Sequence, residues 1–464
     1  MLTRLVPRKT SRRRAARTTL PTLAFLALGL TLVALGAYSA VRPVAGQESF
    51  PEPSEFVSEN GVVQVPLTAE EAQIELAGTP VAGRVYNGGF VGPTMRLNPG
   101  DSIQLELDNT LSEPTNLHFH GLHVSPSGES DNVLRHVMAG EIAPYQVDLP
   151  TDHAPGTYWY HSHQHGISEE QVFGGMSGLI VVEGLIDLLP EELRDIEERS
   201  FALKDFQLTA DGAIVSENID SNAPTTRTVN GAVNPSLSIA PGETQLWRLA
   251  NIGADIWYEV TLEGHPLHVI AEDANPVWAA WSAESLVLPP GKRYDVLVQG
   301  GAPGSYIFRT LDFDQGGDHY PDTTLATVTV EGTAVTPATL PTNLIAQDDP
   351  AHGDLSAAPV DKERTLVFSE DDDLNKFMID GKQFDPNRVD QEVKLGTVEE
   401  WTVRNVTEEL HPFHIHVDDF QVISINGEPY QASGRQDTIP LSGGPYPLQG
   451  LHRQIRLPLP HPQP

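Results

Sequence analysis

The sequence contains no cysteine among its 464 residues. This excludes disulfide bonds, cysteine nucleophiles and any metal centre that depends on a thiolate ligand. Basic residues are also scarce, and residues 1–46 hold eight of them and no acid. The remaining 21 bases and 63 acids give a net charge of −42, so we expect no nucleic-acid or membrane-surface partner. Such a surface would attract cationic substrates or metal ions, although general acidity explains the same composition.

Long apolar runs are lacking after residue 46. Before it, a basic segment that includes Arg12, Arg13 and Arg14 leads into an apolar stretch over 23–38, followed by small residues. This order is typical of an export signal or an uncleaved anchor. We therefore predict that residues 1–46 are a signal segment and that the protein is exported to the periplasm, the cell surface or the medium.

Helical periodicity is nearly absent, and 39 Gly and 38 Pro separate short runs in which apolar and polar residues alternate. This pattern is typical of β-sandwiches. We predict only one short helix, at Leu189–Arg199, where Glu and Leu are frequent.

An internal repeat predicts the domain organisation. Residues 97–109 read LNPGDSIQLELDN, residues 239–251 read IAPGETQLWRLAN and residues 393–405 read VKLGTVEEWTVRN. Each copy has Gly at its fourth position and Asn at its last, which indicates a turn followed by a half-buried strand. The copies start 142 and 154 residues apart, a spacing that suits three successive sandwiches.

Histidines occur as three His-x-His pairs. The pairs are His118 with His120, His161 with His163, and His414 with His416. In a strand, two such side chains point the same way about 7 Å apart, so each pair can bind two metal ions or contribute to one. A single pair is most often two surface histidines, but 17 histidines would rarely produce three pairs by chance.

The repeat also relates the pairs to one another. Nine and eleven residues after the final Asn stand His118 and His120 in the first copy, and His414 and His416 in the third. The same positions in the second copy hold Val260 and Leu262, so the middle domain lacks the ligands.

A second segment repeats later in each domain. Residues 155–163 read PGTYWYHSH and residues 303–311 read PGSYIFRTL. A third copy is due at about 451–460, where nothing matches. Four prolines in the last seven residues also argue against a central strand in this tail.

Together with GTYWYHSHQHG at 156–166 and HPFHIH at 411–416, these repeats resemble the multicopper oxidases, specifically the three-domain, laccase-like branch. The resemblance covers nearly all of the chain after residue 46. It implies an all-β fold of three consecutive cupredoxin-like domains, each a Greek-key β-sandwich. We place them at 47–185, 186–335 and 336–464, with the third truncated.

The resemblance also implies the ligands and the reaction. Of His118 and His120, one binds a type 2 copper and one a type 3 copper, and His161 and His163 bind type 3 coppers. In the third motif, His411 binds the type 1 copper, His414 the type 2 and His416 a type 3. The family couples one-electron oxidation of phenolic, aromatic-amine or metal-ion reductants to reduction of oxygen to water.

One motif of that family is missing. A His-Cys-His segment normally supplies two type 3 ligands and the type 1 thiolate, and this chain has no Cys. The chain therefore offers six of the eight trinuclear ligands and one of the three principal type 1 ligands. We expect its activity to be impaired, and we expect an exposed sheet edge and core face in domain 3.

A shifted reading frame is our hypothesis for the missing motif. Codons compatible with 453–464, read one base further along, permit Gly-Arg-Phe-Val-Tyr-His-Cys-His-Ile-Leu-Asn-His. Codons from Gly444 onward permit Val-Arg-Ile-Arg-Phe-Lys-Asp-Phe-Thr before it. The shifted sequence aligns with 156–163, so our hypothesis is a frameshift near Gly443–Gly444.

Several other residues lie near these motifs. We favour a structural role for Asp131 and Asn132, and a supporting or surface role for His165. His123, His136 and His153 lack ligand spacing, and His265 and His268 lie in the domain without ligands.

Three alternatives remain open at this point. The first is a non-catalytic cupredoxin scaffold of the cell envelope, which would have no reason to keep six cluster histidines. The second is a copper nitrite reductase, which has two domains and one catalytic type 2 copper. The third is a copper-buffering protein of the envelope. Copper content and nitrite turnover discriminate between these functions.

Overall fold

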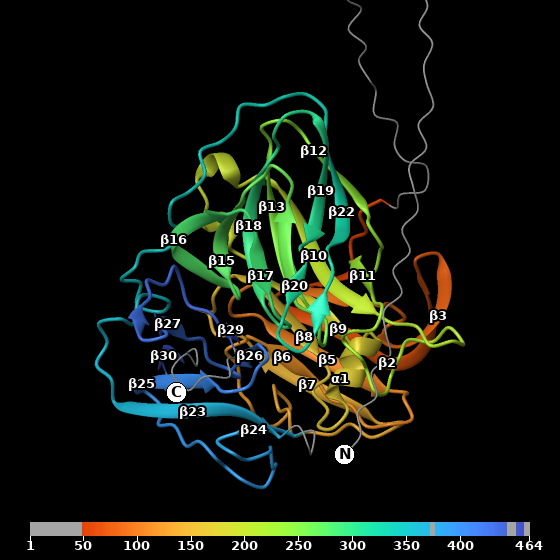
Figure 1. Ribbon diagram of the computed structural model, residues 1–464, viewed down its shortest axis with the longest axis vertical. Coiled ribbons are helices and arrows are strands. Elements are labelled where there is room, and N and C mark those ends of the chain that lie inside the picture. The colour runs from red at the N-terminus through yellow and green to blue at the C-terminus, as the bar shows by residue number, and fades with distance from the viewer. Residues whose placement is uncertain (1–48, 372–375, 443–451, 459–464) are drawn as a thin grey trace, which may run out of the picture. The chain divides into compact units, whose positions relative to one another are not determined.

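Three β-sandwiches follow one another along the chain, as Figure 1 shows for the computed structural model. The structure describes residues 49–371, 376–442 and 452–458. The predicted signal segment and the proline-rich residues 459–464 lie outside these ranges. The prediction of an all-β fold with three cupredoxin-like domains is confirmed.

The first sandwich packs a four-stranded sheet, in the order β3-β2-β5-β7, against a five-stranded sheet, in the order β1-β4-β9-β8-β6. Its strands are β1 (Glu55–Val57), β2 (Val62–Leu76), β3 (Thr79–Tyr86), β4 (Gly92–Leu97), β5 (Ser102–Asn109), β6 (His118–His120), β7 (Ile142–Asp148), β8 (Gly156–His161) and β9 (Ser177–Val182). Buried and exposed residues alternate along β5, because one face of its sheet covers the core.

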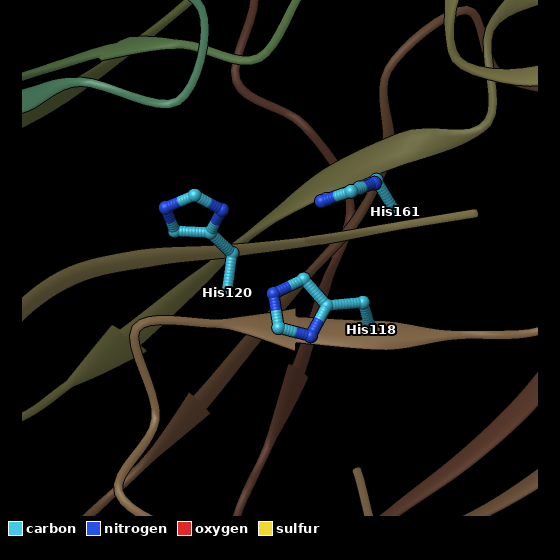
Figure 2. Close-up of side chains that lie close together, drawn as sticks. All are labelled: His118, His120 and His161. Carbon is cyan, nitrogen blue, oxygen red and sulfur yellow. The ribbon is translucent and has the colours of Figure 1, made fainter. Parts of the chain in front are cut away.

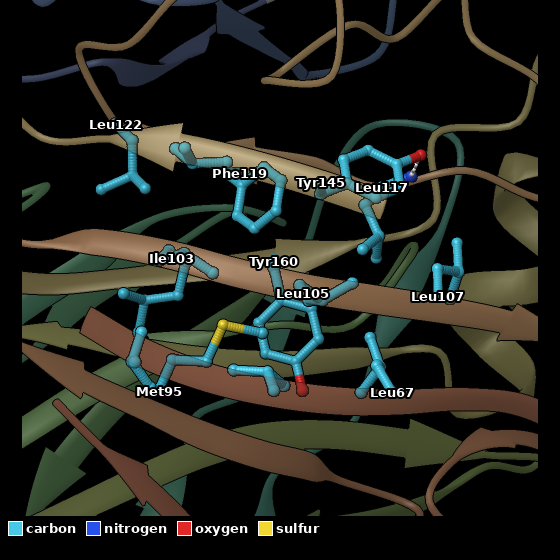
Figure 3. Packing of buried hydrophobic residues seen from close by; sticks show 14 of the residues in the cluster. Leu67, Met95, Ile103, Leu105, Leu107, Leu117, Phe119, Leu122, Tyr145 and Tyr160 are labelled. Carbon is cyan, nitrogen blue, oxygen red and sulfur yellow. Dashed lines mark hydrogen bonds between the residues drawn. The ribbon is translucent and has the colours of Figure 1, made fainter. Parts of the chain in front are cut away.

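The core of the first sandwich lies between the inner faces of its two sheets. Figure 3 shows Leu105 of β5 and Phe119 of β6 among the side chains that fill it. Tyr145 is buried with them and accepts a hydrogen bond from the backbone N–H of Leu117 at 3.3 Å, so its hydroxyl is satisfied. This packing fixes β6, and with it the first histidine pair.

The second sandwich has sheets in the orders β11-β10-β13-β18-β15-β16 and β12-β22-β19-β14-β17, with a β20–β21 hairpin. Its strands are β10 (Glu197–Phe206), β11 (Thr226–Val229), β12 (Ser236–Ile239), β13 (Thr244–Asn251), β14 (Tyr258–Leu262), β15 (Leu267–Glu272), β16 (Asn275–Ala283), β17 (Leu286–Leu288), β18 (Arg293–Gln299), β19 (Gly304–Thr310), β20 (Phe313–Asp314), β21 (His319–Tyr320) and β22 (Thr323–Val330).

The predicted helix at Leu189–Arg199 is wrong. That segment holds the 3₁₀ turn η2 (Glu191–Leu193), which follows η1 (Ile186–Leu188), and then enters β10 at Glu197. Pairing of β10 with β13 and burial of Leu189 and Leu193 outweigh the helical preference of Glu and Leu. A short α-helix, α1 (Ser168–Gly174), occurs instead between the second histidine pair and β9.

The three sequence repeats form equivalent structures. Each begins with a turn whose Gly has a positive φ, +87° at Gly100, +81° at Gly242 and +73° at Gly396. Each continues as a strand that ends at the repeated Asn, in β5, β13 and β25 (Val398–Asn405).

The repeated Asn has the same bonds each time. Asn109, Asn251 and Asn405 are buried, and each side-chain amide donates to two backbone carbonyl groups, one four or five residues further on and one more distant. Each side-chain oxygen accepts a backbone N–H two residues further on. The Asn therefore holds the loop that leads to the ligand-bearing strand, which explains the constant nine-residue spacing.

The third sandwich is incomplete on one side within the described residues. Its larger sheet has the order β24-β23-β25-β30-β27-β28, whereas the facing sheet consists of β26 and β29. The strands are β23 (Lys362–Asp371), β24 (Lys376–Ile379), β26 (His411–His414), β27 (Gln421–Ile425), β28 (Glu428–Pro429), β29 (Thr438–Leu441) and β30 (His452–Pro458).

The expectation that the tail holds no central strand is wrong for 452–458. These residues form β30, which lies between β25 and β27. The prolines did not prevent this, because only Pro458 falls within the strand and it stands at its end. β30 has the position that β7 and β18 have in the other domains, so it does not replace β8 or β19.

Candidate metal centre

Six histidines converge on one cavity of about 280 Å³ between the first and third sandwiches. They are His118, His120, His161, His163, His414 and His416. Strand pairing causes part of this convergence, because β6 pairs with β8 and places His118 opposite His161. Residues of the second sandwich, Pro290 and Gly291, close another side of the cavity.

The imidazole rings are in mutual contact. His118 stacks on His416 with centroids 3.9 Å apart, and His120 stacks on His414 at 3.7 Å. One nitrogen from each of His118, His120 and His161 lies within 4.8 Å of the other two, and Figure 2 shows these three side chains grouped over β6 and β8. A second such group contains His118, His414 and His416.

Hydrogen bonds orient three of these rings. Nδ1–H of His118 donates to the Asp131 carboxylate at 2.9 Å, and Nδ1–H of His161 donates to the Ser162 carbonyl at 2.8 Å. Nδ1–H of His414 donates to the Asp437 carbonyl at 2.9 Å. Because one nitrogen carries the proton, Nε2 of each ring is left as the lone-pair donor.

His120 has the opposite orientation. Its Nε2 lies 3.3 Å from the Asp437 carboxylate and 3.2 Å from the Thr438 hydroxyl. Arg293 counteracts the effect of burial and holds the pKa of Asp437 well below its usual range, so this carboxylate is ionised and accepts the Nε2 proton. His120 therefore offers Nδ1 as its ligand atom.

The six rings are neutral and suited to metal binding. Burial, followed by the proximity of other histidines or of the Arg293 charge, lowers the pKa of every one of them; they are His118, His120, His161, His163, His414 and His416. Nε2 of His118 and of His414 and Nδ1 of His163 are buried without a hydrogen-bond partner. Unpartnered imidazole nitrogens are costly unless they coordinate a metal, and imidazole binds copper well.

A buried ion-pair network lies beside the cluster and was not predicted from the sequence. Arg293 at the start of β18 forms two hydrogen bonds with Asp437, at 2.7 and 2.8 Å, and also contacts Asp273 at 3.5 Å. Lys292 contacts Asp273 at 2.9 Å. A Cβ at Gly121 would lie 2.6 Å from both Arg293 and Asp437, so the residue after His120 must be glycine.

Trp159 was also not singled out from the sequence. Its ring stacks on His161 with centroids 4.1 Å apart, and it lines the cavity. A signal for it was present, because Trp159 and His161 are two residues apart on β8 and therefore share a face.

His411 lies apart from the six-histidine cluster. Its Nε2 donates to Glu370 at 2.6 Å, with the Thr407 hydroxyl 3.0 Å away. It lines a second cavity, of about 430 Å³, with Phe368 and Phe377 near its ring. The position predicted for a type 1 copper therefore has one histidine held by a carboxylate.

The remaining residues have supporting contacts. Asp131 accepts the backbone N–H of Phe119 in addition to its bond with His118, which agrees with a structural role. His165 stacks on Phe384 at 4.5 Å and does not line the cluster cavity.

Three further histidines predicted to be structural or without ligand spacing also bond to protein atoms. His153 Nε2 accepts the backbone N–H of His123 at 3.0 Å. His265 accepts the Gly301 N–H, and His268 bonds to Ser282.

Comparison with known families agrees with this arrangement. Three family models described as multicopper oxidase match residues 68–185, 190–334 and 357–446. The third match ends close to Gly443–Gly444, where the sequence suggests a shifted frame.

Individual relatives cover most of the chain. Multicopper oxidase mco of Staphylococcus epidermidis is 26% identical over 85% of this chain and 84% of its own length. Cell division protein FtsP of Dickeya dadantii is 30% identical over 89% of this chain and 88% of its own. The laccase-like multicopper oxidase CueO of Ochrobactrum sp. superposes with a TM-score of 0.73 at 27% identity, over 89% of this chain and 93% of its own. The chain belongs to the multicopper oxidase family.

Proposed function

We propose that the six-histidine cluster binds copper and that the chain is a laccase-like oxidoreductase with oxygen as electron acceptor. One observation carries this proposal: six neutral imidazoles from two domains converge, and three of their nitrogens are buried without partners. Family membership supports the same chemistry. The residue roles remain those implied by the resemblance.

In this function the polypeptide holds the ligand histidine rings in the orientation that metal binding requires. Asp131, Ser162 and Asp437 hold the rings of His118, His161 and His414, so little reorganisation is needed on binding. Bound copper would supply the one-electron steps that reduce oxygen to water.

Electron entry is the weak point of this chain. The copper–thiolate site used by the family cannot form, because there is no Cys. His411 bonds to Glu370 instead. We therefore propose low turnover for the chain as it stands.

The reductant class follows from two observations. The Ochrobactrum relative has oxidase activity towards lignin model compounds and lignosulfonate, which supports phenolic or aromatic-amine substrates. The acidic composition supports low-valent metal ions as the alternative.

Export is part of the proposal. It rests on the basic and apolar order of residues 1–46, which lie outside the described residues. Within the described ranges, no helix is long and apolar enough to cross a membrane.

A non-catalytic role in the cell envelope is the second candidate. The relatedness to FtsP and the absence of Cys favour it. The oriented ligand nitrogens argue against it, since a scaffold does not require them.

Metal analysis of the purified chain tests the proposal. We expect copper in stoichiometric amount, lost in His161→Ala and in His414→Ala. His319→Ala is the matched control, because this exposed histidine pairs with Asp312 away from the cluster. Copper-free protein, or equal copper in all variants, would favour the scaffold.

Oxygen consumption with a phenolic or Fe(II) reductant then separates the oxidase from a copper-binding protein of the envelope. Slow consumption that disappears with the cluster histidines supports the oxidase. Stoichiometric copper without any oxygen uptake would leave only the binding role.

A further inference from the structure

The facing sheet of the third sandwich lacks two neighbours that its equivalents have. In the first domain β8 and β9 follow β6 in the sheet, and in the second domain β19 and β22 follow β14. The equivalent strand in the third domain is β26, which pairs only with β29 in the described part of the chain. Among the described residues, no strand pairs with the other edge of β26.

Side chains that these neighbours would cover are exposed. Tyr86, Val229 and Ile379 occupy equivalent positions in the three domains. Each is paired with a residue of the neighbouring strand, and that residue is paired on its other side with the repeated Asn. Tyr86 and Val229 are fully buried, whereas Ile379 is 44% exposed. Tyr86 is covered by Tyr160 of β8, with ring centroids 5.7 Å apart.

The start of the repeat shows the same difference. Leu97, Ile239 and Val393 are its first residues, and they are 1%, 2% and 42% exposed. Leu97 pairs with β9 and Ile239 with β22, whereas residues near Val393 form no strand. Ile379 and Val393 are therefore exposed apolar residues on one face of the third sandwich, which we call the open face because no described strand covers it.

A cavity of about 430 Å³ lies on this face. Its walls are mainly apolar and include Leu366, Phe368, Phe377, Ile379 and Phe384, with His411 of β26 at one side. An exposed apolar surface next to an unpaired strand edge is suited to strand addition.

The chain itself shows which strands pair with this kind of edge. β8 begins Gly-Thr-Tyr-Trp-Tyr and β19 begins Gly-Ser-Tyr-Ile-Phe, each directly after a proline. Tyr158 and Tyr160, and likewise Phe308, are buried in their cores. Both strands pair antiparallel with their neighbours β6 and β14.

We propose that the open face of the third domain binds an extended strand donated by another polypeptide, with a Gly-x-aromatic-x-aromatic pattern. The strand adds antiparallel to β26, and its alternate aromatic side chains enter the 430 Å³ cavity. This binding depends on β26 and the apolar face, and it does not require copper.

A synthetic peptide tests the proposal on the full-length chain. The probe is Gly-Arg-Phe-Val-Tyr-His-Ser-His, in which Ser prevents thiol chemistry, and the control is Gly-Arg-Lys-Val-Lys-His-Ser-His. We expect one probe to bind per chain and to slow amide hydrogen exchange in β26, whose amide hydrogens belong to His411, Phe413 and His414 because Pro412 has none. The control tests charge attraction, because the acidic chain would bind a lysine-rich peptide without strand addition.

Variants locate the binding face. Phe377→Lys combined with Ile379→Lys should weaken binding at least about tenfold, because apolar contacts on the face are lost. Both side chains are exposed, so folding should be retained. Val335→Lys is the control, an exposed apolar residue outside the cavity.

Four results would overturn the proposal. The first three are the absence of exchange protection at saturating probe, equal binding of the lysine peptide, and probe binding that the Phe377→Lys and Ile379→Lys substitutions leave unchanged. The fourth is a face that is already occupied without the probe.

Two observations would show such occupation. Protection of β26 amides that increases with protein concentration would indicate a second copy, and probe binding only after removal of 459–464 would indicate the chain's own tail.

Discussion

Arg293 and Asp437 form a buried pair of hydrogen bonds, 2.7 and 2.8 Å long, between residues 144 positions apart. The pair joins the second domain to the third, and the same carboxylate lies 3.3 Å from His120. Arg293 also donates to the Thr157 carbonyl in the first domain at 3.0 Å. One side chain therefore connects all three domains at the position where the histidines converge.

Asp437→Asn should destabilise the protein strongly. It leaves the buried Arg293 charge without its main partner, a loss of about 3–5 kcal/mol in the free energy of unfolding. Asp322→Asn is the control, since its 3.6 Å contact with Arg309 is exposed and should contribute less than about 0.5 kcal/mol. Urea unfolding measures both, and equal stabilities would contradict the structural role of the pair.

Asp131→Asn should weaken copper binding. The amide of Asn can donate to Nδ1 of His118, which favours the tautomer with its proton on Nε2, the nitrogen that faces the cluster. Loss of such a supporting carboxylate lowers metal affinity about 10–100-fold.

The control for this substitution is Asp148→Asn, an exposed carboxylate on β7 that bonds to Ser102. Competitive titration with a chelator compares the three proteins. Unchanged affinity in Asp131→Asn would mean that the orientation of His118 does not depend on this carboxylate.

The features that could be predicted from the sequence are those whose contacts join residues close together along the chain. The repeated Asn ends β5, β13 and β25 as expected, because two of the three backbone bonds of each side chain reach only two to five residues further along the chain. The six cluster histidines could be identified because the His-x-His pairs and their spacing from the repeats are local features of the sequence. The expected strand alternation holds only for His118 and His120, since His163 and His416 lie beyond the ends of β8 and β26.

The rest required the three-dimensional structure. Nothing in the sequence around Asp437 relates it to Arg293, because that contact joins two domains. The segment after Leu189 has helix-forming residues, but the parallel pairing of β10 with β13 decides its conformation. The tail forms β30 because a place between β25 and β27 is available, although its prolines argued against a strand.

His153 should make stability depend on pH. Burial, with a smaller contribution from His123, lowers its pKa from 6.5 to about 3. Between these values the unfolded chain binds a proton that the folded chain does not, so stability falls as the pH decreases from about 6.5 to about 3. The decrease from this group approaches about 1.4 kcal/mol per pH unit.

His153→Gln isolates this contribution, because Gln can still accept the His123 N–H but does not titrate. Urea unfolding from about pH 7, where His153 is neutral in both states, down to about pH 4, inside the window between about 6.5 and about 3, should give a shallower pH dependence for the variant. Parallel curves for the two proteins would show that His153 is not the titrating group.

Restoring the shifted frame should restore electron entry. The variant replaces 444–464 by Val-Arg-Ile-Arg-Phe-Lys-Asp-Phe-Thr-Gly-Arg-Phe-Val-Tyr-His-Cys-His-Ile-Leu-Asn-His, which supplies a strand equivalent to β8 and β19 and brings a thiolate to the domain of His411. A copper–thiolate bond gives intense visible absorption, so the loaded variant should be coloured and should oxidise phenolic reductants faster than the present chain. The matched control carries Ser for that Cys and should keep cluster copper without the colour.

The gene itself decides whether this variant is the native protein. Sequencing from the Asp437 codon to well beyond the stop codon should show one inserted or deleted base near Gly443–Gly444. The end of the family match at 446 agrees with that position. An intact frame with no His-Cys-His downstream would remove the route by which electrons reach the cluster, and the six histidines would then have to be explained by copper binding alone.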